Sequence, residues 1–180
     1  MLFHMLRRQL GDAAFRQGLQ TFYQRNLFRV ADFNAVQDSF ATVADEPLDD
    51  FFQQWVQRTG APQLSIREAR TKSEDGGFRL AAVIEQTQPE AVYHLGLPVA
   101  VHMDGVDKAY QTVVSISNRQ QTLSLTLPAR PLQLDVDPEF DVFRRLHRNE
   151  IPPAVSQAMG AGQVLVVLAE QSPAELKQAY

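Results

Sequence analysis

The spacing of apolar residues changes once along the chain, near residue 62, and this change constrains the fold more than any other feature. Before it, apolar residues recur every three or four positions, as they do on one face of an α-helix. After it, they alternate with polar residues, as they do on one face of a β-strand. The sequence therefore predicts a helical part followed by an all-β part.

Residues 1–61 contain the signals of four helices. Gly11 is a stop signal for the first helix and Asp12 an N-cap for the second, while Asp32 is an N-cap for the third. The fourth helix is predicted to begin near Leu48 and to stop at residues 59–62, which read Thr-Gly-Ala-Pro. Because the connections are short, we expect antiparallel helical hairpins. The apolar positions of the four helices are Leu2, Met5 and Leu6; Phe15, Leu19, Phe22 and Tyr23; Val36, Phe40 and Val43; and Phe51, Phe52, Trp55 and Val56.

Residues 62–140 contain about six runs in which apolar and polar residues alternate, and these runs predict six strands. Turn signals separate the runs at residues 75–77 and 104–105. Gly76 and Gly77 lie between strands and are not followed by the residues of a phosphate-binding loop, so they indicate a hairpin. Strands at this spacing, with no helices between them, predict an antiparallel sandwich of the immunoglobulin type. The predicted strands lie in residues 64–66, 78–84, 97–103, 110–116, 123–127 and 132–136.

Residues 141–180 show a third pattern. We expect one helical turn over residues 140–146 and a helix from Pro152 to Met159. The run Val164–Leu168 is typical of a strand buried on both faces, and Ser172 is a helix N-cap signal. A strand followed by a helix start is the opening of an α/β module. We therefore expect this chain to be a fragment of a longer protein, in which that module continues.

Composition excludes several classes of protein. The chain has 180 residues and no Cys, which excludes a disulfide framework, an iron–sulfur cluster and a thiolate metal site. Its 17 basic and 21 acidic residues give a net charge of −4, which argues against a nucleic-acid-binding protein. No apolar run reaches the roughly 18–20 residues of a membrane helix. The N-terminal residues are apolar first and basic after, the reverse of a secretory signal.

The histidines and the glycine patterns do not predict a catalytic centre. His4, His94, His102 and His147 lie far apart, and the sequence has no H-E-x-x-H pair for zinc. We interpret these histidines as surface residues or satisfied core residues, with a metal site as the less favoured alternative. No G-x-S-x-G turn is present for a nucleophilic serine. We therefore assign no catalytic or metal-binding residue.

Three clusters of charged residues have structural interpretations. Asp49 and Asp50 fall in the first turn of the fourth predicted helix, where negative charge is favourable. Asp135 and Asp137 share one face of a strand end, but too few further oxygen ligands are present to favour a calcium site. The basic cluster at 144, 145 and 148 is expected to form salt bridges with a neighbouring domain rather than an anion site. No binding residue is assigned from these clusters.

Several separated motifs resemble one known family. Residues 3–12 (FHMLRRQLGD), 15–19 (FRQGL), 48–56 and 60–62 (GAP) are similar to the end of the catalytic domain of zinc metallo-aminopeptidases of the aminopeptidase N type, a gluzincin family. In that family such a helical segment runs directly into a β-sandwich, which residues 84–88 and 97–99 resemble. The resemblance covers about 140 residues. The segment after residue 140 departs from the family pattern, in which an all-helical domain often follows.

The resemblance implies a parent enzyme that uses zinc to remove N-terminal residues from peptides. The family's zinc ligands, N-terminus-binding motif and catalytic Tyr all precede a segment like residues 1–12, and no position here matches them. The chain is thus expected to comprise the helical end of a catalytic domain (1–61), a sandwich domain (62–140) and the start of a further module (141–180). Zinc is implied for the parent and no cofactor for this chain. Family resemblance favours a periplasmic or extracellular location.

We expect the missing catalytic lobe of the same polypeptide to be the chief partner, and peptides to be substrates of the parent alone. Helices that have lost their partner lobe expose apolar surface, so the isolated chain is expected to self-associate, through residues 1–30 or through Val164–Leu168. The alternatives are an independent protein-interaction module, a part of a pseudo-peptidase without zinc, and a metal enzyme complete in these 180 residues. The coding frame upstream of Met1 separates them, since it either encodes an H-E-x-x-H helix or does not.

Overall fold

A computed structural model describes residues 1–151, 154, 159, 160, 162 and 163. The chain divides into two compact units, residues 1–146 and residues 147–180. The predicted strand Val164–Leu168 and the helix start at Ser172 lie outside the described residues, as does most of the helix predicted from Pro152. Among the described residues, no helix is both long and apolar enough to cross a membrane.

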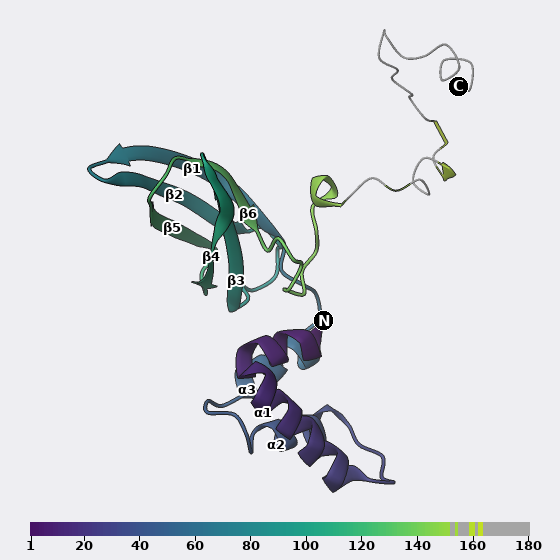
Figure 1. Cartoon of the computed structure of the whole chain (residues 1–180). Coiled ribbons are helices and arrows are strands. Elements are labelled where there is room, and N and C mark those ends of the chain that lie inside the picture. The colour runs from purple at the N-terminus through teal and green to yellow at the C-terminus, as the bar shows by residue number, and fades with distance from the viewer. Residues whose placement is uncertain (152–153, 155–158, 161, 164–180) are drawn as a thin grey trace, which may run out of the picture. The chain divides into compact units, whose positions relative to one another are not determined.

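The helical part of the first unit contains α1 (Leu2–Asn26), α2 (Phe33–Phe40), α3 (Asp49–Phe52) and a π-helical turn, η1 (Gln53–Gln57) (Figure 1). Gly11 interrupts α1 with φ 79° and ψ 165°, so α1 is two helices across a kink, as the glycine predicts. Gly60 follows η1 with φ 95°. The Asp12 carboxylate accepts hydrogen bonds from Arg7 Nε and Nη2 at 2.7 and 3.0 Å. These bonds tie the two halves of α1 together and lower the pKa of the Asp12 carboxyl.

Asp32 caps α2, as predicted, because its Oδ1 accepts a hydrogen bond from Ala35 N at 3.1 Å. This backbone hydrogen bond lowers the pKa of the Asp32 carboxyl. The stabilisation is therefore fully present above the ordinary Asp pKa of about 3.9, and it is lost as the pH falls through the lower folded-state value. We expect Asp32→Ala to lower Tm at pH 7, and the gap in Tm from wild type to narrow as the solution is acidified below about pH 4.

The matched control is Asp32→Asn, which keeps a capping oxygen but cannot titrate. Thermal unfolding followed by circular dichroism at several pH values measures both variants. The difference in Tm between wild type and Asp32→Asn should change as the pH is lowered. The difference in Tm between Asp32→Asn and Asp32→Ala should stay constant. A gap between wild type and Asp32→Ala that stays constant down to the lowest pH would show that the capping bond does not depend on the charge.

The helices enclose a small apolar core of their own. Gly18 of α1 lies against the ring of Phe40, so a β-carbon at residue 18 would stand 2.4 Å from Phe40 Cδ1. Phe15 contacts the same ring, with centroids 5.5 Å apart. The absence of a side chain at Gly18 thus lets α1 and α2 approach closely. The buried residues of this core are Leu6, Val36, Phe40, Leu48 and Phe52.

The strands form two antiparallel three-stranded sheets, ordered β1-β2-β5 and β4-β3-β6 (Figure 1). Each predicted run became a strand, and the predicted turns at 75–77 and 104–105 became the β1–β2 and β3–β4 hairpins. The predicted helical part followed by an antiparallel β-sandwich is thereby confirmed. The bounds are β1 (Leu64–Glu74), β2 (Gly77–Gln86), β3 (Leu95–Met103), β4 (Val106–Ile116), β5 (Gln120–Leu127) and β6 (Pro131–Val136).

Alternating side chains of both sheets fill the space between them. β3 is the central strand of its sheet and is buried along most of its length, while β2 buries every second residue. This pattern follows from the position of each strand, because edge strands such as β1 and β4 leave most residues exposed. The buried residues of the main sandwich core are Leu64, Ala82, Ile84, Tyr93, Leu95, Leu97, Val99, Ile116, Leu123 and Val142.

The helical turn predicted over residues 140–146 is wrong. This segment is irregular, and a single bridge pairs Arg145 with Gln63. Asp137 and Phe140 have φ of 52° and 55°, which takes the backbone out of helical geometry just where the turn would begin. The Asp137 carboxylate accepts the N–H groups of Asp141 and Val142 instead, at 2.7 and 3.2 Å. The segment therefore packs onto the first unit as a loop.

Candidate functional site

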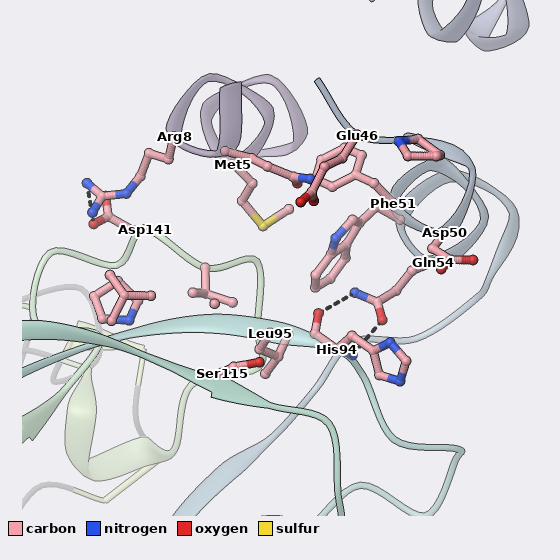
Figure 2. Close-up of a pocket in the computed structure, with 17 residues that line it drawn as sticks. Met5, Arg8, Glu46, Asp50, Phe51, Gln54, His94, Leu95, Ser115 and Asp141 are labelled. Carbon is pink, nitrogen blue, oxygen red and sulfur yellow. Dashed lines mark hydrogen bonds and ion pairs between the residues drawn. The ribbon is translucent and has the colours of Figure 1, made fainter. Parts of the chain in front are cut away.

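A cavity of about 690 Å³ lies where the helical part meets the sandwich (Figure 2). Both parts belong to the first unit. The walls of the cavity come from α1, the α3–η1 region, the start of β3, the end of β4 and the loop after β6. The residues that line it are Met5, Arg8, Gln9, Glu46, Pro47, Asp50, Phe51, Gln54, Trp55, His94, Leu95, Gly96, Pro98, Val113, Ser115, Asp141 and Val142.

Gln54 of η1 joins the helical part to the sandwich through the backbone of His94. Its Oε1 accepts from His94 N at 2.7 Å, and its Nε2 donates to His94 O at 2.9 Å (Figure 2). Both hydrogen bonds use the amide group of one side chain, so they fix the rotation of η1 as well as its distance from β3. A charged side chain at residue 54 could not make this pair, because it would offer only donors or only acceptors.

Aromatic rings pack beside this amide pair. Trp55 stacks on the buried ring of Tyr93 with centroids 5.4 Å apart and an interplanar angle of 28°. Phe143 meets Trp55 edge to face at 6.1 Å. The Arg58 guanidinium covers the Tyr93 ring at 3.7 Å and donates to the carbonyls of Val92 and Ala91. Trp55 of the fourth predicted helix therefore packs against the sandwich, while Phe51 and Phe52 pack in the helical core.

Two buried glutamines hold the segment between β2 and β3 in place for these contacts. Gln86 receives a hydrogen bond from Tyr93 N and donates to Tyr93 O, both at 2.8 Å. Gln88 donates to Gln86 Oε1 at 3.0 Å and accepts from Gln63 N at 3.1 Å. Buried amides are costly unless they are hydrogen-bonded, and these two satisfy each other and the backbone. They present Tyr93 and His94 to the helical part.

Charged residues form the other side of the contact between the helical part and the sandwich, which we call the joint. Asp141 Oδ1 lies 2.7 Å from His4 Nε2. Asp141 Oδ2 lies 2.9 Å from Arg8 Nη1 (Figure 2). Behind it, Arg144 Nε donates to Asp137 Oδ2 at 2.8 Å, and the two side chains are 1% and 0% exposed. Phe143 N also donates to Met5 Sδ at 3.3 Å. The loop after β6 thus anchors the start of α1.

The structure places the remaining candidate residues apart from one another. His102 Nε2 lies 3.2 Å from Asp135 Oδ2 on the sandwich surface, and Asp49 accepts from Gln37. His147 caps the 3₁₀ turn η2 (Arg148–Glu150). Asp135 and Asp137 do not face a common site, because the Asp137 carboxylate turns inward to Arg144. No group of three or more His, Asp or Glu side chains within the described ranges is arranged to hold a metal ion.

Sequence reasoning missed the role of Asp141, which was not singled out although it binds two residues of α1. Arg144 was expected to form a salt bridge with a neighbouring domain, and it pairs with Asp137, a residue of the predicted sandwich domain (62–140). The signal that could have found the contacts of Asp141 is a basic group at residues 4, 7 and 8 together with acidic residues after the last strand, at 137, 139 and 141. That signal has no characteristic spacing, because 137 positions separate His4 from Asp141.

Comparison with known proteins relates this chain to aminopeptidases. Aminopeptidase N of Lactococcus lactis subsp. lactis is 28% identical over 64 residues, which are 36% of this chain and 8% of that protein. The crystal structure of Legionella pneumophila aminopeptidase A in complex with aspartic acid superposes with a TM-score of 0.61 at 12% identity, over 81% of this chain and 17% of that one. No protein-family model matches the sequence. The chain therefore has an aminopeptidase-like fold and spans a small part of each of these proteins.

Proposed function

We propose that this chain is the non-catalytic, C-terminal portion of a zinc aminopeptidase-like protein, and that it supports a catalytic lobe that precedes it. The parent would cleave N-terminal residues from peptides, with zinc bound by residues outside this chain. One observation carries the proposal: a sequence match to one aminopeptidase and a fold match to another agree, while each covers only a small part of the larger protein.

The contacts of the joint favour a structural role for this chain. Polar and aromatic side chains of η1 and α1 bind residues of the sandwich and of the loop after β6, and these contacts orient the helices. Such an arrangement would let the sandwich fix the last helices of a catalytic domain. The alternatives are a stand-alone protein-interaction module and a part of a pseudo-peptidase that has lost its zinc ligands.

The coding frame upstream of Met1 tests the proposal. An H-E-x-x-H helix, a downstream Glu and a Tyr shortly before Met1 are expected. The protein expressed from the whole frame should then hydrolyse aminoacyl anilides, and a chelator should abolish that activity until zinc is restored. A frame of the right length in which those residues are replaced would establish the pseudo-peptidase. A frame that stops just before Met1 would leave the interaction module and overturn the proposal.

Exposed apolar side chains at the far end of the helical part predict self-association of the isolated chain. Tyr23, Leu27, Phe28 and Val30 lie at the end of α1 and in the loop after it, and Phe28 and Val30 are fully exposed. Exposed apolar residues that gather in this way mark contact surfaces. We expect the chain to form dimers or larger species at high concentration in sedimentation experiments, and Tyr23→Ser/Phe28→Ser to shift it towards monomer.

The control for this prediction is Leu132→Ser, which removes an exposed apolar side chain from β6 instead. It should leave the association unchanged. Wild-type chain that stays monomeric at high concentration would contradict the prediction. Association that both substitutions weaken equally would show that it does not depend on the end of α1.

A further inference from the structure

The end of α1 and the loop after it, residues 23–33, hold apolar side chains outside the helical core; we call this segment the tip (Figure 1). Residues 27–34 are all exposed. Phe28 and Val30 are 99% and 104% exposed, as they would be in an extended chain. Phe28 also has φ 58°, a backbone conformation that is uncommon for a large side chain. The fold thus keeps an aromatic residue in water at a conformational cost, which points to a partner that covers it.

Two arginines flank these apolar residues. Arg25 lies in the last turn of α1, and Arg29 lies between Phe28 and Val30. Among the described residues, neither guanidinium has a hydrogen-bond or ion-pair partner. Residues 13–31 contain three Arg and no Asp or Glu, although the chain as a whole has a net charge of −4. The next acid, Asp32, already accepts hydrogen bonds within its own turn. The tip is therefore a basic surface on an acidic chain.

A lipid surface fits this combination better than a protein surface does. Apolar residues that dock on a protein usually share one flat patch, in which their own chain covers part of each side chain. Fully exposed side chains such as Phe28 and Val30 project from the chain instead, and fluid lipid can surround them without a pocket of matching shape. Guanidinium groups beside them are attracted to anionic headgroups. The exposed Tyr23 has the apolar body and polar end that are typical of membrane interfaces.

We propose that the tip binds the surface of a membrane that contains anionic lipids. Phe28 and Val30 enter the boundary between headgroups and acyl chains, and Arg25 and Arg29 bind lipid phosphates. Insertion is shallow, because the peptide groups of the loop need headgroups or water for their hydrogen bonds. The proposal concerns residues of this chain and does not rest on the proposed function. Because the same residues are expected to mediate self-association, anionic vesicles should compete with it.

Vesicle flotation of the full chain tests the binding. Vesicles of phosphatidylcholine with about one third phosphatidylserine are compared with vesicles of phosphatidylcholine alone. We expect the chain to float with the anionic vesicles, to float much less with the neutral ones, and to be released by salt. Sedimentation of the remaining free chain shows whether its oligomers decrease as vesicles are added.

A fluorescence measurement tests which residues enter the lipid. Phe28→Trp adds a reporter at the tip, and lipids with brominated acyl chains quench a Trp that reaches them. We expect quenching in this variant. The wild-type chain is the control, because its single Trp, Trp55, packs against the sandwich and should not be quenched.

Two kinds of variant separate the apolar and the charged contribution. Phe28→Ser should lower the partition coefficient by about tenfold or more, as expected when one large apolar side chain no longer leaves water. Arg25→Gln/Arg29→Gln should lower it by about 10- to 30-fold on anionic vesicles and little on neutral ones. The matched controls on the sandwich surface are Leu132→Ser and Lys72→Gln/Lys108→Gln, which should have much smaller effects. Circular dichroism checks that each variant keeps the wild-type fold.

Four results would overturn the proposal. The first is a chain that does not float with anionic vesicles; oligomers that persist in their presence would then assign the tip to a second copy of this chain. The second is equal binding to neutral and anionic vesicles. The third is binding that the control variants weaken as much as the tip variants do. The fourth is binding without quenching of Phe28→Trp, which would show that another face of the molecule meets the lipid.

Discussion

Asp137→Ala is expected to destabilise the first unit by about 3–5 kcal/mol, which is the largest effect we predict for a single substitution. The Asp137 carboxylate is buried and accepts from Arg144 Nε, Asp141 N and Val142 N. Its removal takes away the carboxylate that accepts from the buried Arg144 Nε, and it deprives two backbone N–H groups of their acceptor. Urea unfolding at equilibrium, followed by circular dichroism, measures the free energy of unfolding.

Asp135→Ala is the matched control, because Asp135 lies two residues away and pairs with His102 at the surface. Surface pairs contribute about 0–1 kcal/mol, so this variant should remain close to wild type. Asp137→Leu/Arg144→Met removes both charges together and should recover part of the loss. A loss for Asp137→Ala no larger than that for Asp135→Ala would show that the loop after β6 contributes little to the stability of the unit.

Gly18→Ala is expected to destabilise the chain by about 1–3 kcal/mol, although the same change in a solvent-exposed helix stabilises by up to about 1 kcal/mol. The new methyl group would stand 2.4 Å from Phe40 Cδ1 and 2.5 Å from Phe40 Cε1. The Phe40 ring is fully buried and packed against Phe15, so it cannot move away without opening the helical core. Equilibrium unfolding measures the sign as well as the size of the change.

Two further variants interpret this result. Gln17→Ala changes the preceding, exposed position and should be nearly neutral. Gly18→Ala/Phe40→Leu gives the methyl group more room and should lose less stability than the two single changes added together. A stabilising Gly18→Ala would mean that α1 and α2 do not pack as closely as the structure has them.

Most helix and strand positions could be predicted from the sequence because their signals are local. Gly11, Asp32 and Gly60 each mark a helix end through a backbone conformation or a cap that depends on a few neighbouring residues. The strands followed from alternation, since each has one face towards the core. Local sequence decides the structure where the residues of a helix or strand satisfy the hydrogen-bonding groups of its own backbone.

The joint could not be predicted in the same way. Gln54 meets His94, and His4 meets Asp141, across 40 and 137 positions, and no periodicity connects such pairs. The wrong helical turn at residues 140–146 has a different cause. Its apolar and basic pattern is compatible with a helix, but the Asp137 carboxylate accepts hydrogen bonds from the N–H groups of Asp141 and Val142. A side-chain acceptor four and five residues away thus overrode a weak helical preference.

The amide pair between Gln54 and His94 has a consequence for how the molecule opens. The N–H and the carbonyl of His94 are both occupied by one side chain of η1, in the manner of a neighbouring strand residue. These two backbone groups can exchange Gln54 for water only when η1 withdraws from the start of β3. Fraying of the sandwich at this end and detachment of the helices are therefore a single event, and the two parts share one opening transition there instead of having one each.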